Sequence, residues 1–167
     1  MCKRAERKIS KFRAVRYLEL RIPPVALALA FALAMWAVAR VLSAASYRLP
    51  GAPVIALGLA VAGGGISLAG LLTFRRHRTT VNPTKPEAAT SIVTDGIYRF
   101  TRNPMYLGLV LALAAWAICL ANMVALLLLP VFVAYMNEFQ IKSEERALLA
   151  RFGSRYADYV TAVRRWL

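Results

Sequence analysis

Cysteine, histidine and acidic side chains are scarce in this sequence of 167 residues, and each scarcity excludes a class of site. The two cysteines, Cys2 and Cys119, are too few and too far apart for a disulfide framework or a thiolate metal site. His77 is the single histidine, which excludes a zinc or iron centre held by several imidazoles. Glycine-rich phosphate loops and a nucleophile elbow are also missing. We therefore expect no metal.

Acidic residues number only 8 against 22 basic ones, giving a net charge of +14, although 59% of the residues are hydrophobic. Disordered chains combine high net charge with few apolar residues, so this composition excludes disorder. The charges are also segregated, because residues 22–39, 49–74 and 103–137 contain none. Long uncharged runs between basic clusters indicate an integral membrane protein.

The three uncharged runs predict the number of membrane segments. The first two, of 18 and 26 residues, are each long enough to cross a bilayer. The third would measure about 52 Å as one helix, too long for a hydrocarbon core of about 30 Å. We predict that it folds back at Ala121-Asn122 into helices over 104–120 and 123–139. The predicted fold is all-α, a polytopic membrane bundle with about four membrane segments, of which the last two form a tight hairpin, and with cytoplasmic C-terminal helices.

The positions of the basic residues predict orientation. Of the 22, 20 lie in residues 1–21, 75–102 and 137–167, which an even number of crossings places on one side. Positive charge assigns that side to the cytoplasm, together with both termini, and favours membrane lipids over nucleic acid as partners. We expect a multi-pass membrane protein. It divides into a basic, interfacial segment 1–21, two transmembrane helices within 22–74 and a third region over 75–167.

A segment dense in aromatic and basic side chains leads into the third apolar run. Asn103 suits the N-cap of the next helix and Pro104 its first position. These two residues explain where a helix starts, but they do not explain why aromatic and arginine side chains gather around that start. These side chains are Tyr98, Arg99, Phe100, Arg102 and Tyr106.

Two adjacent carboxylates follow the fourth predicted helix. Ser143 is expected to cap a new helix, with Glu144 and Glu145 in its first turn and Gly153 at its end. The helix topology places these carboxylates at the same membrane face as the tyrosines before and within the third apolar run. An anionic pair beside tyrosines suits a ligand that carries positive charge and hydroxyl groups.

Three linked strings resemble the signature of the integral-membrane methyltransferases, which include isoprenylcysteine carboxyl methyltransferases and phospholipid methyltransferases. They are Val93-Thr94-Asp95-Gly96-Ile97-Tyr98, then Arg102-Asn103-Pro104-Met105-Tyr106-Leu107-Gly108, and then Glu144-Glu145 followed by Leu148, Phe152-Gly153, Tyr156 and Tyr159. The resemblance covers roughly residues 50 to 167, including the order and spacing of the strings.

The resemblance implies methyl transfer from S-adenosylmethionine to a lipophilic or lipidated acceptor, with 75–167 as the catalytic region. Because the family has bacterial members, it also implies a location in a bacterial inner membrane. The family's cofactor contacts map onto Ser91, Ile92, Val93, Tyr98, Asn103, Pro104, Met105, Tyr106 and Glu144. Asn103 stands where the family usually has histidine, so it cannot act there as an acid or a base. Gln140 stands at the substrate-binding position where members acting on isoprenylcysteine carry arginine, which argues against that acceptor.

The residues themselves are compatible with this chemistry. Methyl transfer from a sulfonium is an in-line displacement that needs alignment and exclusion of water, and neither a triad nor a metal. We expect Arg102 and Glu145 to orient the acceptor. A carboxylate acceptor would need a cation, for which Arg99, Arg102 or Lys142 could serve, whereas an amine would need a base, such as Glu145.

Two other functional classes remain open at this point. One is a membrane reductase that acts on sterols or steroids with NADPH, which shares a similar helical C-terminal pattern. The other is a small, non-catalytic basic protein that binds anionic lipid or a partner helix.

Overall fold

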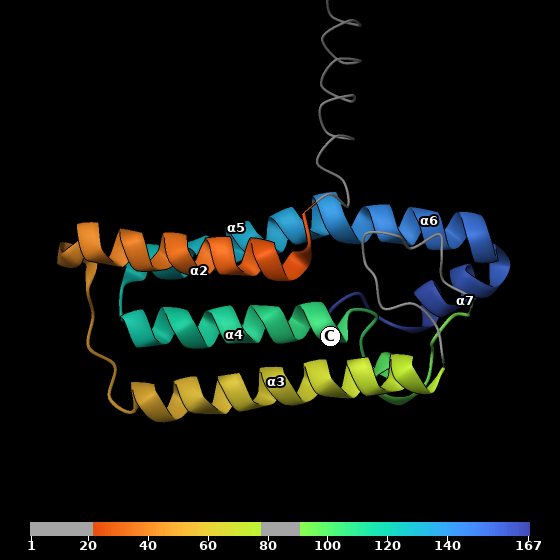
Figure 1. Cartoon of the computed structure of the whole chain (residues 1–167), viewed down its shortest axis with the longest axis horizontal. Coiled ribbons are helices and arrows are strands. Elements are labelled where there is room, and N and C mark those ends of the chain that lie inside the picture. The colour runs from red at the N-terminus through yellow and green to blue at the C-terminus, as the bar shows by residue number, and fades with distance from the viewer. Residues whose placement is uncertain (1–21, 78–90) are drawn as a thin grey trace, which may run out of the picture.

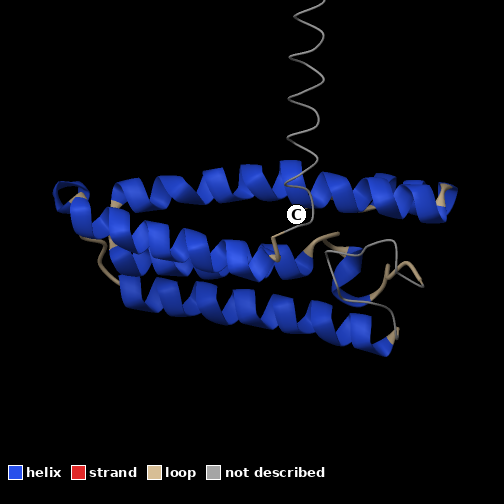
Figure 2. Cartoon of the chain, turned by 45° about the horizontal axis from the view of Figure 1, so that its top comes forward, coloured by secondary structure: helices blue, strands red, loops and turns tan. Residues whose placement is uncertain are grey.

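The computed structural model describes residues 22–77 and 91–167, and the expectations for residues 1–21 lie outside them. Long helices run side by side, and the short C-terminal helices extend beyond one end of the bundle (Figure 1). In the described part of the chain every regular element is helical (Figure 2). The elements are α2 (Pro24–Val41), η1 (Ser43–Ala45), α3 (Ala52–Arg76), η3 (Gly96–Arg99), α4 (Pro104–Leu120), α5 (Met123–Tyr135), the π-helix η4 (Met136–Ile141), α6 (Lys142–Phe152) and α7 (Ser154–Ala162).

The lengths of these helices confirm the predicted fold class. By length and composition, α2, α3 and the continuous helical stretch Met123–Phe152 are each able to cross a membrane. The helix α4 is also apolar but shorter, with 17 residues. Three long apolar helices and one shorter one therefore form a helical membrane bundle.

A buried asparagine forms the turn between α4 and α5, as the sequence predicts. Ala121 ends α4 with a left-handed backbone, at a φ of 48°. The Asn122 side chain accepts hydrogen bonds from the backbone N–H groups of Val124 and Ala125 at 3.0 and 3.1 Å, which caps α5. Its amide also donates to the Leu42 carbonyl at 2.8 Å. One side chain thus closes the hairpin and fixes it to the end of α2.

The α2–α3 connection and the α4–α5 turn lie at the same end of the bundle. The Tyr47 backbone N–H, between α2 and α3, donates to the Ala121 carbonyl at 2.9 Å. Arg40 lies in the last turn of α2 and Arg48 in the connection from η1 to α3, so these two arginines, which stand outside the three basic clusters of the sequence, belong to this end. The start of α4 and the whole of α6 lie at the other end, together with the remaining described basic residues. The bundle therefore has one basic end, as the charge pattern predicts.

Glycine allows α3 and α4 to pack almost backbone to backbone. A Cβ atom on Gly108 would lie 1.9 Å from Ser67 Oγ and 2.5 Å from the Gly63 carbonyl oxygen. Without a hydrophobic effect between helices in lipid, such close packing drives their association. Not every glycine of α3 serves this contact, because Gly58, Gly64 and Gly65 face open space. The sequence could not tell these glycines from Gly63.

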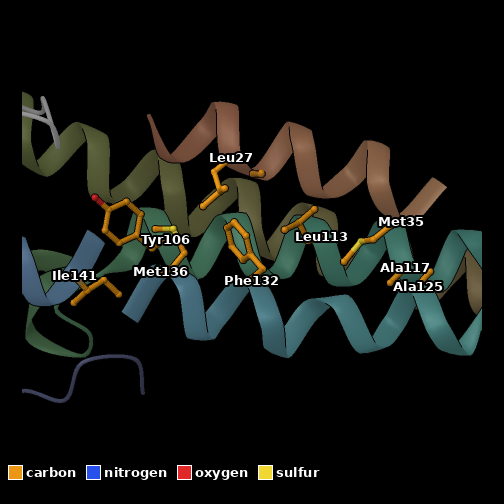
Figure 3. Close-up of a cluster of buried hydrophobic side chains, with 10 residues drawn as sticks. Leu27, Met35, Tyr106, Leu113, Ala117, Ala125, Phe132, Met136 and Ile141 are labelled. Atoms are coloured by element: carbon orange, nitrogen blue, oxygen red, sulfur yellow. The ribbon is translucent and has the colours of Figure 1, made fainter. Parts of the chain in front are cut away.

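Side chains from α2, α4 and α5 fill the interior of the bundle (Figure 3). Phe132 is fully buried, and its ring packs edge-on against Phe31 with centroids 5.3 Å apart. Met35 and Met136 are also fully buried beside it. The Trp116 indole donates to the Ala32 carbonyl at 2.9 Å, a polar contact between α4 and α2. The interior therefore holds α2 against the α4–α5 hairpin.

A π-helical turn corrects the prediction for the region after α5. The fourth helix was expected over 123–139, with a new helix capped by Ser143. Instead α5 passes through η4 into α6 without a break, so Ser143 is helical and buried rather than a cap. The π-turn keeps Met136 and Ile141, five residues apart, both in the core.

We predict that Gly108→Ala destabilises the bundle by about 1–3 kcal/mol, because the Gly63 backbone cannot move away from the new methyl group. Gly65→Ala is the matched control, since a Cβ there meets nothing within 4 Å. Thermal unfolding of both variants in detergent measures the difference. Equal midpoints for the two variants would contradict the close approach of α3 and α4.

Candidate functional site

A carboxylate lies where α4 begins and α6 begins. The Tyr106 hydroxyl, in the first turn of α4, donates to Glu144 Oε1. The Gln140 amide, from the π-turn, donates to the same oxygen at 2.7 Å. The same amide also lies 3.5 Å from the Tyr106 hydroxyl. The prediction that the tyrosine-rich segment meets the glutamate pair is confirmed, and we call Tyr106, Gln140 and Glu144 the carboxylate cluster.

Tyr98 lies beside this cluster, on the short helix η3. Its ring is buried and packs edge-on against Phe74, with centroids 5.2 Å apart. Its backbone carbonyl accepts a hydrogen bond from the Tyr159 hydroxyl at 2.7 Å. Burial raises the pKa of Tyr98 well above its usual value, with smaller contributions from Tyr159 and Glu144. Burial likewise raises the pKa of Tyr159 to about 12. Both phenols therefore stay protonated at neutral pH and remain able to donate.

Two arginines share the second glutamate. Arg102 Nη2 lies 3.0 Å from Glu145 Oε1, and Arg165 contacts both oxygens of Glu145, with distances of 3.1 Å from Nε and 2.6 Å from Nη2. The Arg102 side chain is only 9% exposed, and its Nη1 donates to the Val160 carbonyl at 3.2 Å. Arg102, Glu145 and Arg165 are the arginine cluster. Two guanidinium groups against one carboxylate leave it with a net positive charge.

Of the three cations that the sequence offered for a carboxylate acceptor, the structure places only Arg102 in this cluster. Lys142 pairs instead with Glu138, four residues earlier, on the exposed side of the helix. Arg99 is exposed as well. Periodicity could not separate these candidates, because burial depends on how α7 and the C-terminal residues cover the start of α4.

The predicted cofactor residues before η3 lie apart from these hydrogen bonds. Val93 is buried and Ile92 is partly buried. The Ser91 hydroxyl is buried and has no hydrogen-bond partner among the described residues. Among the described residues, Ser91, Ile92 and Val93 form no side-chain hydrogen bond to the carboxylate cluster. A role for them in cofactor binding stays a prediction.

The predicted residues at the start of α4 have structural contacts of their own. Pro104 occupies the first helical position, as expected, and is buried. The side chains of Pro104 and Met105 pack against Gly70 of α3. Their Cγ atoms lie 3.1 and 3.3 Å from the position that a Cβ atom on Gly70 would take. Asn103 precedes α4 but does not cap it with its side chain. Its amide donates to the Arg165 carbonyl at 2.9 Å instead.

Sequence reasoning missed the C-terminal residues. Arg165 belongs to the arginine cluster, and the Trp166 indole donates to Asn137 Oδ1 at 3.0 Å. The Thr101 hydroxyl, fully buried, lies 3.4 Å from the Arg165 carbonyl. The only signal in the sequence is the triplet Arg164-Arg165-Trp166, which is basic and aromatic like the segment before α4.

Comparison with known proteins agrees with this architecture. The helices and the two polar clusters at one end define a multi-pass membrane protein with a partly buried polar site. The phospholipid methyltransferase family matches residues 52–155, which include both clusters apart from Arg165. The chain belongs to this family of membrane methyltransferases, and the resemblance found in the sequence is confirmed.

Two relatives place the similarity within the chain. An uncharacterized protein of Haemophilus influenzae is 46% identical over 63 residues, which are 38% of this chain and 100% of that protein. The protein-S-isoprenylcysteine O-methyltransferase of Schizosaccharomyces pombe is 34% identical over 68 residues, which are 41% of this chain and 29% of that enzyme. The chain therefore matches less than a third of the length of the Schizosaccharomyces enzyme. No solved structure matches the chain with significance.

We predict that Glu145→Ala costs about 3 kcal/mol of stability, because it leaves two neighbouring guanidinium groups uncompensated. Glu138→Ala removes the same side chain from an ion pair whose two members are about half exposed, at 53% and 48%. We expect that change to cost about 0.5 kcal/mol or less. Thermal unfolding in detergent compares the two variants. An equal effect would contradict the buried arginine cluster.

Proposed function

We propose that this protein is an S-adenosylmethionine-dependent methyltransferase that transfers a methyl group to a lipophilic acceptor. The observation that carries the proposal is the carboxylate cluster, in which α4 and α6 join around Glu144 at the basic end of a membrane bundle. Membership of a methyltransferase family implies a methyl donor. The membrane location supports an acceptor that reaches the site from the bilayer.

The residues present fit such a cofactor. It carries positive charge on its sulfonium and amino groups, hydroxyl groups on its ribose and a carboxylate. Glu144 offers a carboxylate to the cationic groups and to the ribose hydroxyls, and its hydrogen bonds from Tyr106 and Gln140 are both accepted by Oε1. Arg102 offers a buried Nε–H for the carboxylate, without a described partner. The buried Ser91 hydroxyl is a further unmatched group. Buried polar groups normally have partners, so these positions suit a polar ligand.

The site needs few chemical groups for the transfer. When bound, the cofactor supplies an electrophilic methyl group, and an in-line displacement from it requires no proton at the leaving group. Tyr106 and Gln140 hold the Glu144 carboxylate in one orientation, so its hydrogen bonds to a ligand need no reorganisation. Both oxygens of Glu145 already accept from guanidinium groups. We therefore assign Glu145 to holding Arg102 rather than to removing a proton.

The orientation in the membrane is part of the same proposal. The basic end of the bundle carries both polar clusters and the positive charge that favours the cytoplasmic face. We assign this end to the cytoplasmic side of a bacterial inner membrane. A water-soluble cofactor would then enter from the cytoplasm and a lipophilic acceptor from the adjacent leaflet.

We predict that the protein in detergent binds S-adenosylhomocysteine saturably and does not bind NADPH. Tyr106→Phe and Glu144→Gln should each weaken this binding by about tenfold or more, the loss expected when a hydrogen bond to a charged group is removed. Tyr47→Phe, at the opposite end of the bundle, and Glu138→Gln, exposed, are the matched controls. Calorimetry measures the affinities. Unchanged binding in both test variants would remove the site assignment, and NADPH binding alone would indicate a reductase.

We predict that incubation with a radiolabelled methyl donor and a total lipid extract labels a fraction that partitions into organic solvent. The Glu144→Gln variant should lose most of this labelling, because its cofactor binding is weakened. Chromatography of the labelled fraction identifies the acceptor class. Label confined to water-soluble products would contradict a lipophilic acceptor.

A further inference from the structure

The last five residues, 163–167, cross the start of α4 and reach the π-turn, and we call them the C-terminal strap. The Arg102 backbone N–H donates to the Arg164 carbonyl at 3.0 Å, and the Asn103 amide donates to the Arg165 carbonyl at 2.9 Å. The Trp166 indole then reaches Asn137 at 3.0 Å. The strap thus connects two elements that are far apart in the sequence.

Arg165 connects the strap to the arginine cluster. Its guanidinium contacts both oxygens of Glu145, the geometry that fixes a carboxylate most firmly. The same carboxylate receives Arg102 Nη2 at 3.0 Å. Arg165 therefore determines where Glu145 lies, and Glu145 in turn determines the plane of the Arg102 guanidinium.

The fixed plane of Arg102 leaves one of its three nitrogens without a partner among the described residues. Its Nη1 and Nη2 atoms contact Val160 and Glu145, whereas its buried Nε–H has no partner among residues 22–77 and 91–167. An unmatched buried donor costs free energy unless a ligand satisfies it. The net positive charge of the cluster selects an anionic ligand group, and a carboxylate matches the planar donors of arginine.

We propose that Arg165 is a positioning residue that, through Glu145, aims Arg102 Nε–H at a carboxylate oxygen of a bound ligand. This inference rests on the proposed methyl transfer. The carboxylate belongs either to the amino-acid part of the cofactor or to the methyl acceptor. Through these two ion pairs the C-terminal strap contributes to the site itself.

Binding measurements on the full chain in detergent test the inference with two probes. S-adenosylhomocysteine carries the carboxylate, whereas 5′-methylthioadenosine lacks the whole amino-acid part. If Arg102 meets the cofactor, Arg165→Ala should weaken S-adenosylhomocysteine binding by about tenfold or more and leave 5′-methylthioadenosine unchanged. Arg165→Lys, which keeps the charge but not the two-point contact, should recover part of the loss. Arg155→Ala, an exposed arginine of α7, is the matched control.

A second result also supports the inference and assigns the carboxylate to the acceptor. In that case Arg165→Ala leaves both affinities unchanged and raises the KM measured with a total lipid extract as methyl acceptor, with kcat little altered. Equal weakening of both probes would overturn the inference, because it would mean general loosening of the site. The inference would also be overturned if Arg165→Ala had the same two affinities and the same KM as Arg155→Ala. If the unaltered protein binds neither probe, the proposed function fails, and this inference fails with it.

Discussion

The structure depends on one constraint, which is that the Glu144 carboxylate must find hydrogen-bond donors inside a membrane bundle. The Tyr106 hydroxyl and the Gln140 amide provide them. Because Tyr106 lies in the first turn of α4 and Glu144 follows α5, the hairpin must bring its two outer ends together. The buried Asn122 turn closes the hairpin at the far end and makes this meeting possible. The polar site and the fold are therefore stabilised by the same contacts.

The π-turn reconciles two demands on one helix. Phe132 before it and Met136 at its start must face the apolar interior, whereas Gln140 and Glu144 must face the start of α4. A regular α-helix has a fixed rotation per residue, so it cannot change its facing side abruptly. The wider turn Met136–Ile141 supplies the extra rotation without ending the helix. Such turns are frequent at functional sites.

The two polar clusters at the basic end have different chemical roles. The carboxylate cluster joins α4 to α6 and presents an acceptor, and the arginine cluster presents donors and a net positive charge. A ligand with cationic groups, hydroxyl groups and a carboxylate complements both. The C-terminal strap completes the arginine cluster through Arg165, which lies beyond the residues that match the family, 52–155. The site is thus formed by the start of α4, the start of α6 and the C-terminal strap, which are far apart in the sequence.

The sequence by itself determined the apolar spans, the turn at Ala121-Asn122, the proline that begins α4 and the meeting of Tyr106 with Glu144, because each follows from local run length, capping chemistry or helix order. Only the tertiary structure decided that Gly63 and Gly108 touch whereas Gly65 does not, and that α5 continues through a π-turn where Ser143 suggested a cap. It also decided that Arg102, rather than Arg99 or Lys142, joins Glu145 and Arg165. These choices depend on the rotation and the close approach of whole helices, which no local pattern of residues records.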